Sequence, residues 1–471
     1  MKNKEETSIL KNYTLVSIIC AGLSFFTMLV LTRMLSEEDY GKINLFYSAS
    51  NVVMSIACFG LDSAYIRFYY EPPNGSSSKT LAFHCIVPSV LLLSVFSFIL
   101  LSINKIQMIS GLIGGNGITY VIAFIFVVWG MFIVRYLTVF FRMNGKVIIF
   151  AIVSIFLVVL TKSIVIVLHF IFHNLYIDII FSAFIFALFS LVIVFRYFYK
   201  IIEIKRICFR NYSEVYKYAL LASPIFVITY LNGYLPQIII SNKLGEDILG
   251  VYTAALLFCS AIQVLSTGFT TFWSPYMFKH YKDRIEIIKK VHDMAFAVAF
   301  FVLSFLLVFC DFIYLFIGER FRKYQELIGF FLFFPIVNIL VETTSYGISI
   351  KKKNEISLVI YLIVMLLNVS LSLILVDRLF LFGVAISSFV SSGLFFVLMT
   401  HYGQRFYKSV NDLKKSYVNI FLLCLIPIVF YFFYSNRIYF IISDLIIVLL
   451  FIIFNYRSFH MMIKYIKLRN Q

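Results

Sequence analysis

The chain has 471 residues, of which 62% are hydrophobic and only 13% are charged, and its formal net charge is +17. Soluble domains average about 25% charged residues, so this composition excludes a soluble globular protein and favours one whose main solvent is lipid. A basic chain can bind nucleic acid, but the placement of the charge gives it another role here, and we expect no nucleic acid partner.

Long apolar segments follow one another along almost the whole chain. A bilayer core needs about 20 apolar residues per helix, and lipid requires each segment to satisfy its own backbone hydrogen bonds. We therefore predict an all-α polytopic membrane protein with about fourteen transmembrane helices. The first segment is too long for the core of a cleaved signal peptide, so we expect it to be retained. The predicted helices span residues 13–34, 41–62, 81–103, 118–140, 147–168, 175–198, 216–241, 248–272, 291–317, 325–348, 356–376, 379–402, 416–434 and 436–455.

Lysine and arginine gather in the N-terminal tail, in alternate loops and in the C-terminal tail. Because cytoplasmic loops carry the excess of these residues in membrane proteins, the pattern predicts that both termini lie in the cytoplasm. The excess positive charge then faces the anionic lipid of the inner leaflet, which explains the net charge without a nucleic acid.

The longest loop, around residues 199–215, is basic and lies halfway along the chain. We interpret it as the link between two halves of six helices each. The expected organisation is an N-terminal lobe over residues 1–200, a cytoplasmic linker over 201–215 and a C-terminal lobe over 216–402. Two further helices and a cytoplasmic tail occupy residues 403–471.

One short motif occurs twice. "LSEEDYG" at 35–41 follows the first apolar segment, and "LGEDILG" at 244–250 follows the seventh. Both lie on the predicted outer face, and both lead directly into another helix. Six helices separate them, an even number, so the two copies share one orientation in the membrane. Such parallel repeats are typical of transporters whose two lobes are related by an axis along the membrane normal.

Three stretches carry a family resemblance: "VLTRMLSEEDYGKINLFYS" at 30–48, "FGLDSAYIRFYYE" at 59–71 and "LFGVAISSFVSS" at 381–392. They resemble segments of the Wzx-type O-antigen and capsular polysaccharide flippases. This family is the polysaccharide transporter branch of the multidrug/oligosaccharidyl-lipid/polysaccharide (MOP) exporter superfamily. The topology resembles that family over the whole chain, with two homologous six-helix lobes and two extra helices in a MATE-like fold.

The resemblance implies a function. The protein would move undecaprenyl-pyrophosphate-linked oligosaccharide from the cytoplasmic to the outer leaflet of the bacterial inner membrane by alternating access. The product would be O-antigen, capsule or exopolysaccharide. The implied partners are the lipid-linked oligosaccharide, membrane lipids, and the polymerase and chain-length regulator of the same pathway. We expect a monomer and no enzymatic activity.

A pyrophosphate and a glycan cannot cross hydrocarbon unaided, because removing water from charged and polar groups is too costly. Such a cargo therefore needs cations within the helices, and arginine suits phosphate best because its planar group donates two hydrogen bonds. Arg135 lies within the fourth predicted helix and Lys162 within the fifth. A charge at a helix centre costs about 2.5–3.5 kcal/mol, which favours a functional role. The alternatives are a headgroup contact for Arg135 and an ion pair with Asp178 for Lys162.

Three further cations are predicted to bind the substrate from helix ends. Arg67 ends the predicted second helix on the cytoplasmic side, at a helix that lines the cavity in relatives. Arg33 and Lys243 end the first and seventh helices on the outer side. Anchoring to lipid headgroups is the alternative for all three.

The predicted seventh helix is interrupted by Pro224, Gly233 and Pro236, and it carries the polar residues Asn232 and Gln237 near its middle. Interrupted polar helices often mark the binding region of a transporter, so we predict that both polar residues line the cavity. Helix packing through glycine and interhelical hydrogen bonds is the alternative.

An acid within a membrane helix can bind a proton or Na⁺, so Glu342 in the tenth helix is a candidate for ion coupling. The alternative is that it neutralises an arginine of the cavity. His169 and His173 have the i, i+4 spacing of metal ligands. Asp178 is the one candidate for a third ligand, and we expect no metal and no cofactor. The glycine-rich "GLIGGNG" at 111–117 lacks the Lys-Ser/Thr of a P-loop, so we expect no phosphate site there.

Three other functions remain open. A multidrug or cation exporter of the same superfamily would need acids in its cavity, whereas the candidates here are mostly arginine and lysine. A polysaccharide polymerase, an enzyme of the same pathways, usually needs a large external loop, and the loops of this chain are short. A scaffold for a synthesis complex would require neither the repeat nor the interrupted helix.

Overall fold

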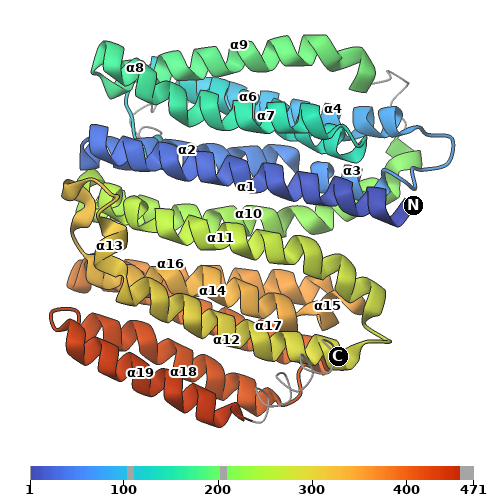
Figure 1. Cartoon of the computed structure of the whole chain (residues 1–471). Helices are drawn as coiled ribbons and strands as arrows, with labels where there is room; N and C mark the ends of the chain where they lie inside the picture. Colours follow the sequence, from blue (N-terminus) through green and yellow to red (C-terminus); the bar gives the residue numbers. More distant parts are fainter. Residues whose placement is uncertain (1, 103–110, 202–208, 457–471) are drawn as a thin grey trace. The chain divides into compact units, whose positions relative to one another are not determined.

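The computed structural model describes residues 2–102, 111–201 and 209–456, and every element that these residues form is a helix (Figure 1). The prediction of an all-α protein is therefore confirmed. Part of the predicted linker, 202–208, and part of the predicted tail, 457–471, lie outside the described residues.

The chain forms two compact units, Met1–Thr253 and Ala254–Gln471, and the boundary falls within helix α11. The lobes and linker predicted from the sequence stay a prediction. The first unit contains α1 (Lys2–Met34), α2 (Glu37–Cys58), α3 (Leu61–Phe68), α4 (Ser78–Ser102), α6 (Ile118–Met143), α7 (Val147–Val158), the π-helix η1 (Val159–Ser163), α8 (Ile164–Phe172), α9 (Leu175–Ile201), η2 (Phe209–Tyr212), α10 (Ser213–Leu244) and the start of α11 (Glu246–His280).

The second unit continues from α11 through helices of similar length and a few short turns. Its elements are α12 (Ile285–Val308), α13 (Cys310–Tyr314), η3 (Glu319–Arg322), η4 (Gln325–Leu327), α14 (Ile328–Thr344), α15 (Tyr346–Ile350), α16 (Asn354–Leu379), α17 (Leu381–Phe406), α18 (Leu413–Phe432) and α19 (Arg437–Phe454).

Eleven stretches of the described chain are long and apolar enough to cross a membrane, or twelve if the bent pair α2 and α3 is one span. One of these stretches, 354–406, contains both α16 and α17. The apolar part of α1, Ile18–Met34, is shorter than the others. The protein is therefore a multi-pass membrane protein, and the expected number of fourteen spans is approximate.

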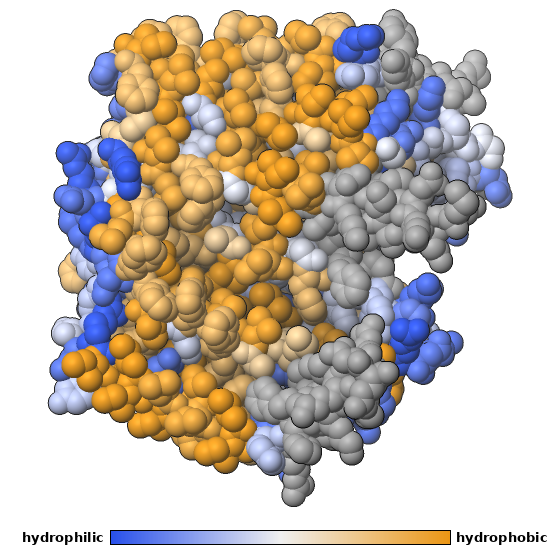
Figure 2. Space-filling view, in the orientation of Figure 1, coloured by the Kyte–Doolittle hydropathy of each residue, from blue (hydrophilic) through white to orange (hydrophobic). Residues whose placement is uncertain are grey.

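The surface chemistry fits a lipid environment. On the face shown in Figure 2, hydrophobic side chains cover the middle of the helices and hydrophilic side chains gather near the helix ends. Large apolar side chains such as Phe98, Phe195 and Phe301 are more than two-thirds exposed. Water would oppose this exposure, since burying one such side chain is worth about 1.5–3 kcal/mol, whereas lipid accepts it.

The two copies of the repeated motif lie against each other within the first unit. α2 begins at Glu37 and α11 at Glu246, and Gly41 and Gly250 occupy the same position in the two helices. A Cβ atom added to Gly41 would overlap the backbone of Glu246, and one added to Gly250 would overlap the backbone of Glu37. Only glycine lets the two helix starts approach this closely, so the reciprocal contact explains why each copy of the motif ends in glycine.

Candidate functional site: a cationic pocket among the helices of the first unit

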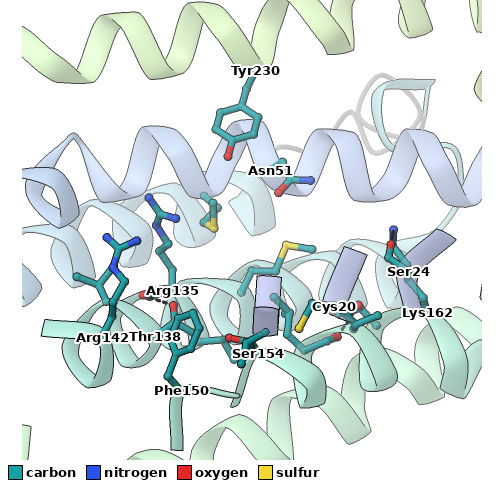
Figure 3. A pocket seen from close by; sticks show the side chains of 18 residues that line it. Cys20, Ser24, Asn51, Arg135, Thr138, Arg142, Phe150, Ser154, Lys162 and Tyr230 are labelled. Atoms are coloured by element: carbon teal, nitrogen blue, oxygen red, sulfur yellow. Dashed lines mark hydrogen bonds between the residues drawn. The ribbon is translucent and has the colours of Figure 1, made fainter. Parts of the chain in front are cut away.

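A pocket of about 520 Å³ opens among five helical segments of the first unit (Figure 3). Its walls come from α1, α2, α6, α10 and the helix formed by α7 and η1. The lining residues are Val16, Cys20, Ser24, Asn51, Met54, Met131, Val134, Arg135, Thr138, Val139, Arg142, Phe150, Ser154, Leu157, Val158, Thr161, Lys162 and Tyr230.

Helical periodicity places these side chains on one wall. On α6 the lining residues include Met131, Arg135, Thr138 and Arg142, which are three or four positions apart. Residues at this spacing share one face of an α-helix. α6 therefore presents two arginines, two helical turns apart, to the same space.

Arg135 is held by an acid from a neighbouring helix. Its Nε and Nη2 atoms donate hydrogen bonds of 2.8 and 2.7 Å to Oδ2 of Asp62. The Asp62 side chain is only 8% exposed, whereas that of Arg135 is 44% exposed. The pair therefore buries the acid and leaves part of the guanidinium facing the pocket, where it can still donate to an anion.

A sharp bend positions Asp62, and it differs from the predicted second helix. That helix was expected to run to residue 62 and to end near Arg67. Instead α2 ends at Cys58, and α3 continues at an angle of 54°. Phe59 and Gly60 both adopt left-handed backbone angles, with φ of 47° and 69°, which breaks the helix there. A Cβ on Gly60 would also lie 2.6 Å from the carbonyl oxygen of Ala219 on α10.

Lys162 reaches the pocket from a π-helical turn. The helix predicted over 147–168 is not a uniform α-helix, because Val159–Ser163 forms the π-helix η1. Single π turns often occur at functional sites, since the extra residue re-aims neighbouring side chains. Lys162 Nζ donates a 2.6 Å hydrogen bond to Ser24 Oγ on α1, and Tyr47 donates to the carbonyl oxygen of Thr161.

The alternative partner proposed for Lys162 is wrong. Asp178 Oδ2 lies 2.8 Å from Nδ1 of His169, at the turn between α8 and α9, while Lys162 contacts Ser24. Among the described residues, no group of three histidine, cysteine or acidic side chains is placed to hold a metal ion.

The pocket has a marked charge asymmetry. Of the 18 described residues that line it, three are cationic (Arg135, Arg142 and Lys162) and none is acidic. In Figure 3 the two arginines lie toward one end, and Lys162 lies with Ser24 toward the other. Tyr230 points into the space from α10. The arrangement can bind an anion and contact polar, uncharged groups with hydroxyl, amide and aromatic side chains.

Two of the seven predicted substrate-binding residues, Arg135 and Lys162, line this pocket. Five do not: Arg67, Arg33, Lys243, Asn232 and Gln237. Arg67 forms an ion pair of 3.1 Å with Glu71, four positions later in the chain, and both side chains are more than half exposed. The Gln237 side chain is buried, and its Nε2 donates to the Gly233 carbonyl oxygen at 3.2 Å.

Arg33 and Lys243 are exposed, and Asn232 is partly buried on α10. Glu342 lies in the second unit, on α14, where it accepts a 3.0 Å hydrogen bond from the Tyr346 hydroxyl. The substrate-binding roles of these residues, and ion coupling by Glu342, stay predictions.

Sequence reasoning missed several lining residues, of which Arg142 is the most important. Arg142 is on the last turn of α6, whereas the predicted fourth helix ends at residue 140 and leaves Arg142 in the following loop. Its spacing of seven from Arg135 was the signal that could have found it, because residues seven apart share a helix face. Tyr230, Asn51 and Ser154 carried no comparable signal, since hydroxyls, amides and aromatic rings are common in membrane helices.

Solved structures share the fold of this chain. A structure of the lipid II flippase MurJ, in an inward closed conformation, matches with a TM-score of 0.67 and 15% identity, covering 96% of this chain and 99% of that one. An inward-facing multidrug resistance MATE family transporter matches with a TM-score of 0.58 and 15% identity, covering 83% and 98%. The chain therefore has the fold of these two structures.

The family model described as "Polysaccharide biosynthesis protein" matches residues 11–281, which is more than half of the chain. The chain belongs to this family. No protein of curated function gives a significant match.

Proposed function

We propose that this protein is a flippase that moves undecaprenyl-pyrophosphate-linked oligosaccharide from the cytoplasmic to the outer leaflet of the bacterial inner membrane. It would act by alternating access, with both termini in the cytoplasm, and supply O-antigen, capsule or exopolysaccharide synthesis. Membership of a polysaccharide biosynthesis family and a fold similar to that of transporters support this proposal.

The observation that carries the proposal is the charge of the pocket. A cation at the centre of a membrane helix costs about 2.5–3.5 kcal/mol on insertion. Arg135 and Lys162 nevertheless lie within membrane helices, and with Arg142 from the last turn of α6 they face one pocket whose described lining contains no acid. A positive site between membrane helices suits an anionic cargo. It does not suit the cations that a multidrug exporter would carry.

Each part of the cargo has a matching environment. Arg135 and Arg142 would bind the pyrophosphate, because guanidinium groups donate paired hydrogen bonds to phosphate oxygens. Asn51, Ser154 and Tyr230 would contact sugar hydroxyls or ring faces. The polyprenyl tail can stay in the bilayer, so no protein group needs to carry it across.

Asp62 would occupy the hydrogen-bond donors of Arg135 that the pyrophosphate uses when it binds. It neutralises part of the Arg135 charge while the pocket is empty and keeps the guanidinium in position. An arriving pyrophosphate brings at least two negative charges, and it would compete with Asp62 for the N–H groups of Arg135. Binding would therefore weaken the Asp62–Arg135 contact next to the bend between α2 and α3.

The membrane potential can drive this movement. One elementary charge that crosses 100 mV is worth about 2.3 kcal/mol, so two negative charges leaving a negative-inside cell gain roughly 4.6 kcal/mol. Ion coupling through Glu342 is the second proposal for the driving force. Its carboxylate is partly buried in a membrane helix, where an acid can bind a proton or Na⁺.

A binding experiment tests the pocket directly. The full chain is placed in lipid nanodiscs and titrated with a fluorescent prenyl-pyrophosphate-linked disaccharide. Arg142→Gln should weaken binding by tenfold or more, because a hydrogen bond to a charged group contributes about 1.5–3 kcal/mol. Lys146→Gln is the matched control, since Lys146 is a nearby exposed cation outside the pocket lining.

Equal affinity of the wild type and Arg142→Gln would contradict this assignment of the pyrophosphate site. Preferential binding of lipophilic cations would favour the exporter instead.

A further inference from the structure

A second, more polar pocket lies at the other end of the first unit, on the predicted outer face. It has a volume of about 560 Å³, within the range of about 300–1,000 Å³ that is typical of ligand pockets. Its walls come from the starts of α2, α6, α9 and α11 and from the glycine-rich tip 111–117. We call it the tip pocket.

The tip packs closely on α2 and α6 because it lacks side chains at two positions. A Cβ atom on Gly114 would lie 3.0 Å from the carbonyl oxygen of Lys42. A Cβ on Gly115 would overlap the ring of Tyr120, which lines the pocket. The glycines therefore allow the tip to pack on α2 and α6 without filling the space, which gives the "GLIGGNG" stretch a role other than holding phosphate.

The charges of the tip pocket do not by themselves indicate a ligand. Glu38, Asp39 and Glu246 lie in the first turns of α2 and α11, where acids stabilise helices through the macrodipole. Lys42 contacts Glu38 at 2.5 Å and Glu246 at 3.3 Å. With three acids and one lysine, the pocket is negative, so it disfavours phosphate and other anions.

An unsatisfied hydroxyl is the observation that points to a ligand. Tyr120 lines the pocket and is only 2% exposed, and no described residue hydrogen-bonds its hydroxyl. Leaving a buried polar group without a partner is unfavourable, and a ligand that supplies the missing bond recovers that loss. Tyr176, which stacks on Tyr120 with ring centres 5.8 Å apart, is 39% exposed beside the same pocket.

Together these groups match a carbohydrate. A sugar hydroxyl both donates and accepts hydrogen bonds, and the lining offers carboxylate acceptors, the Lys42 donor and the amides of Asn116 and Asn174. Asn174 Oδ1 already caps α9 by accepting from the Tyr176 N–H at 3.1 Å, which leaves its NH₂ group to donate. Aromatic faces suit the apolar face of a sugar ring.

We infer that the tip pocket is a glycan-binding subsite that takes a neutral or aminated sugar and disfavours uronic acids. This inference rests on the proposed function, since it takes the ligand to be the saccharide part of the cargo. The subsite would hold the glycan on the outer side after the pyrophosphate has left the cationic pocket.

Free saccharides test the inference without involving transport. The full chain in nanodiscs is titrated with a panel of neutral, aminated and uronic-acid-containing di- to tetrasaccharides that carry neither lipid nor phosphate. Affinity is measured by saturation-transfer NMR and by the shift of the melting temperature. At least one neutral or aminated member should bind, and its uronic acid counterpart should bind more weakly.

Tyr120→Phe is the key variant because it removes the hydroxyl and keeps the ring. The empty variant should be at least as stable as the wild type, while affinity for the saccharide should fall about fivefold, as expected for one hydrogen bond. Tyr65→Phe is the matched control. Tyr65 is also 2% exposed, and its hydroxyl has no hydrogen-bond partner among the described residues. It lies on α3 outside the tip pocket, so only the stability of the protein should respond to this variant.

Two results would overturn the inference: no saccharide binds the wild type, or Tyr120→Phe binds as tightly as the wild type. If lipid-linked cargo binds and free saccharides do not, the subsite is wrong and the proposed function stands. If free saccharides bind but a deletion strain still exports its glycan, the proposed function is wrong and the subsite stands.

Discussion

Two sets of polar side chains, one in each unit, differ in what surrounds them. In the first unit, Arg135 and Lys162 sit on membrane helices and face a pocket. In the second unit, His292 is enclosed, with Nδ1 at 2.7 Å from Thr343 Oγ1 and Nε2 at 2.8 Å from Ser416 Oγ. Both of its ring nitrogens are satisfied by neighbouring helices, and no pocket is needed to explain it.

The same contrast holds for amides. Asn419 on α18 and Asn455, just after the end of α19, bond each other reciprocally at 3.2 and 2.9 Å. Such closed pairs hold helices together, and interhelical hydrogen bonds in membranes contribute about 0.6–2 kcal/mol each. A polar group within a membrane helix therefore indicates a site only when its partners leave it facing open space. Arg135 meets that condition in spite of its bond to Asp62.

Removing Arg135 should have the largest effect, on both stability and transport. Arg135→Ala leaves the Asp62 carboxylate buried without its two donors, which should cost about 3–5 kcal/mol. The double variant Asp62→Asn with Arg135→Gln removes both charges, so it should recover most of this stability while glycan export stays lost. Melting temperature and surface glycan are measured on all three proteins. Export at the wild-type level by the double variant would show that Arg135 acts only through stability.

Replacing His292 should affect stability alone. His292→Ala removes a buried ring that bonds two hydroxyls, and we expect the free energy of unfolding to fall by about 2–4 kcal/mol. Export per folded molecule should remain normal, because the ring belongs to a closed network. His401→Ala, at an exposed histidine of the same unit, serves as the control with little effect. A selective export defect in His292→Ala at normal protein levels would contradict a role for His292 in stability alone.

Arg67→Ala should have the smallest effect on stability. Its ion pair with Glu71, which lies beyond the end of α3, is exposed, and exposed pairs contribute about 0.2–1 kcal/mol. The variant also tests the predicted substrate-binding role of Arg67. Export close to the wild-type level would assign Arg67 to lipid headgroups, whereas a severe loss at normal protein levels would place it on the path of the cargo.

Much of the fold could be predicted from the sequence, because lipid leaves a chain few options. Apolar runs of about 20 residues had to be helices, and each of the fourteen predicted segments contains one. The repeated motif was also visible in the sequence. The structure adds the reason for its glycines, which allow a close contact between two helix starts. These features depend on local composition, which a single sequence displays directly.

The site could be predicted only in part. Arg135 and Lys162 were found because a charge stands out in an apolar helix. The partner of Arg135 was not, because Asp62 is 73 positions away and reaches it through a bend made by two left-handed residues. The π turn at Lys162 was equally hidden, since nothing in "VLTKS" differs from an ordinary α-helix. Contacts between distant segments and irregular backbone carry no local signal.

The flip itself is the central claim, and one measurement on the native bacterium tests it most directly. In a deletion strain, undecaprenyl-linked saccharides are extracted, and surface glycan is labelled separately on intact cells. We predict that complete single units accumulate on the inner leaflet and that surface glycan is lost. Single units that still reach the surface unpolymerised would contradict the flippase and indicate a polymerase, and an unchanged surface with new drug sensitivity would indicate an exporter.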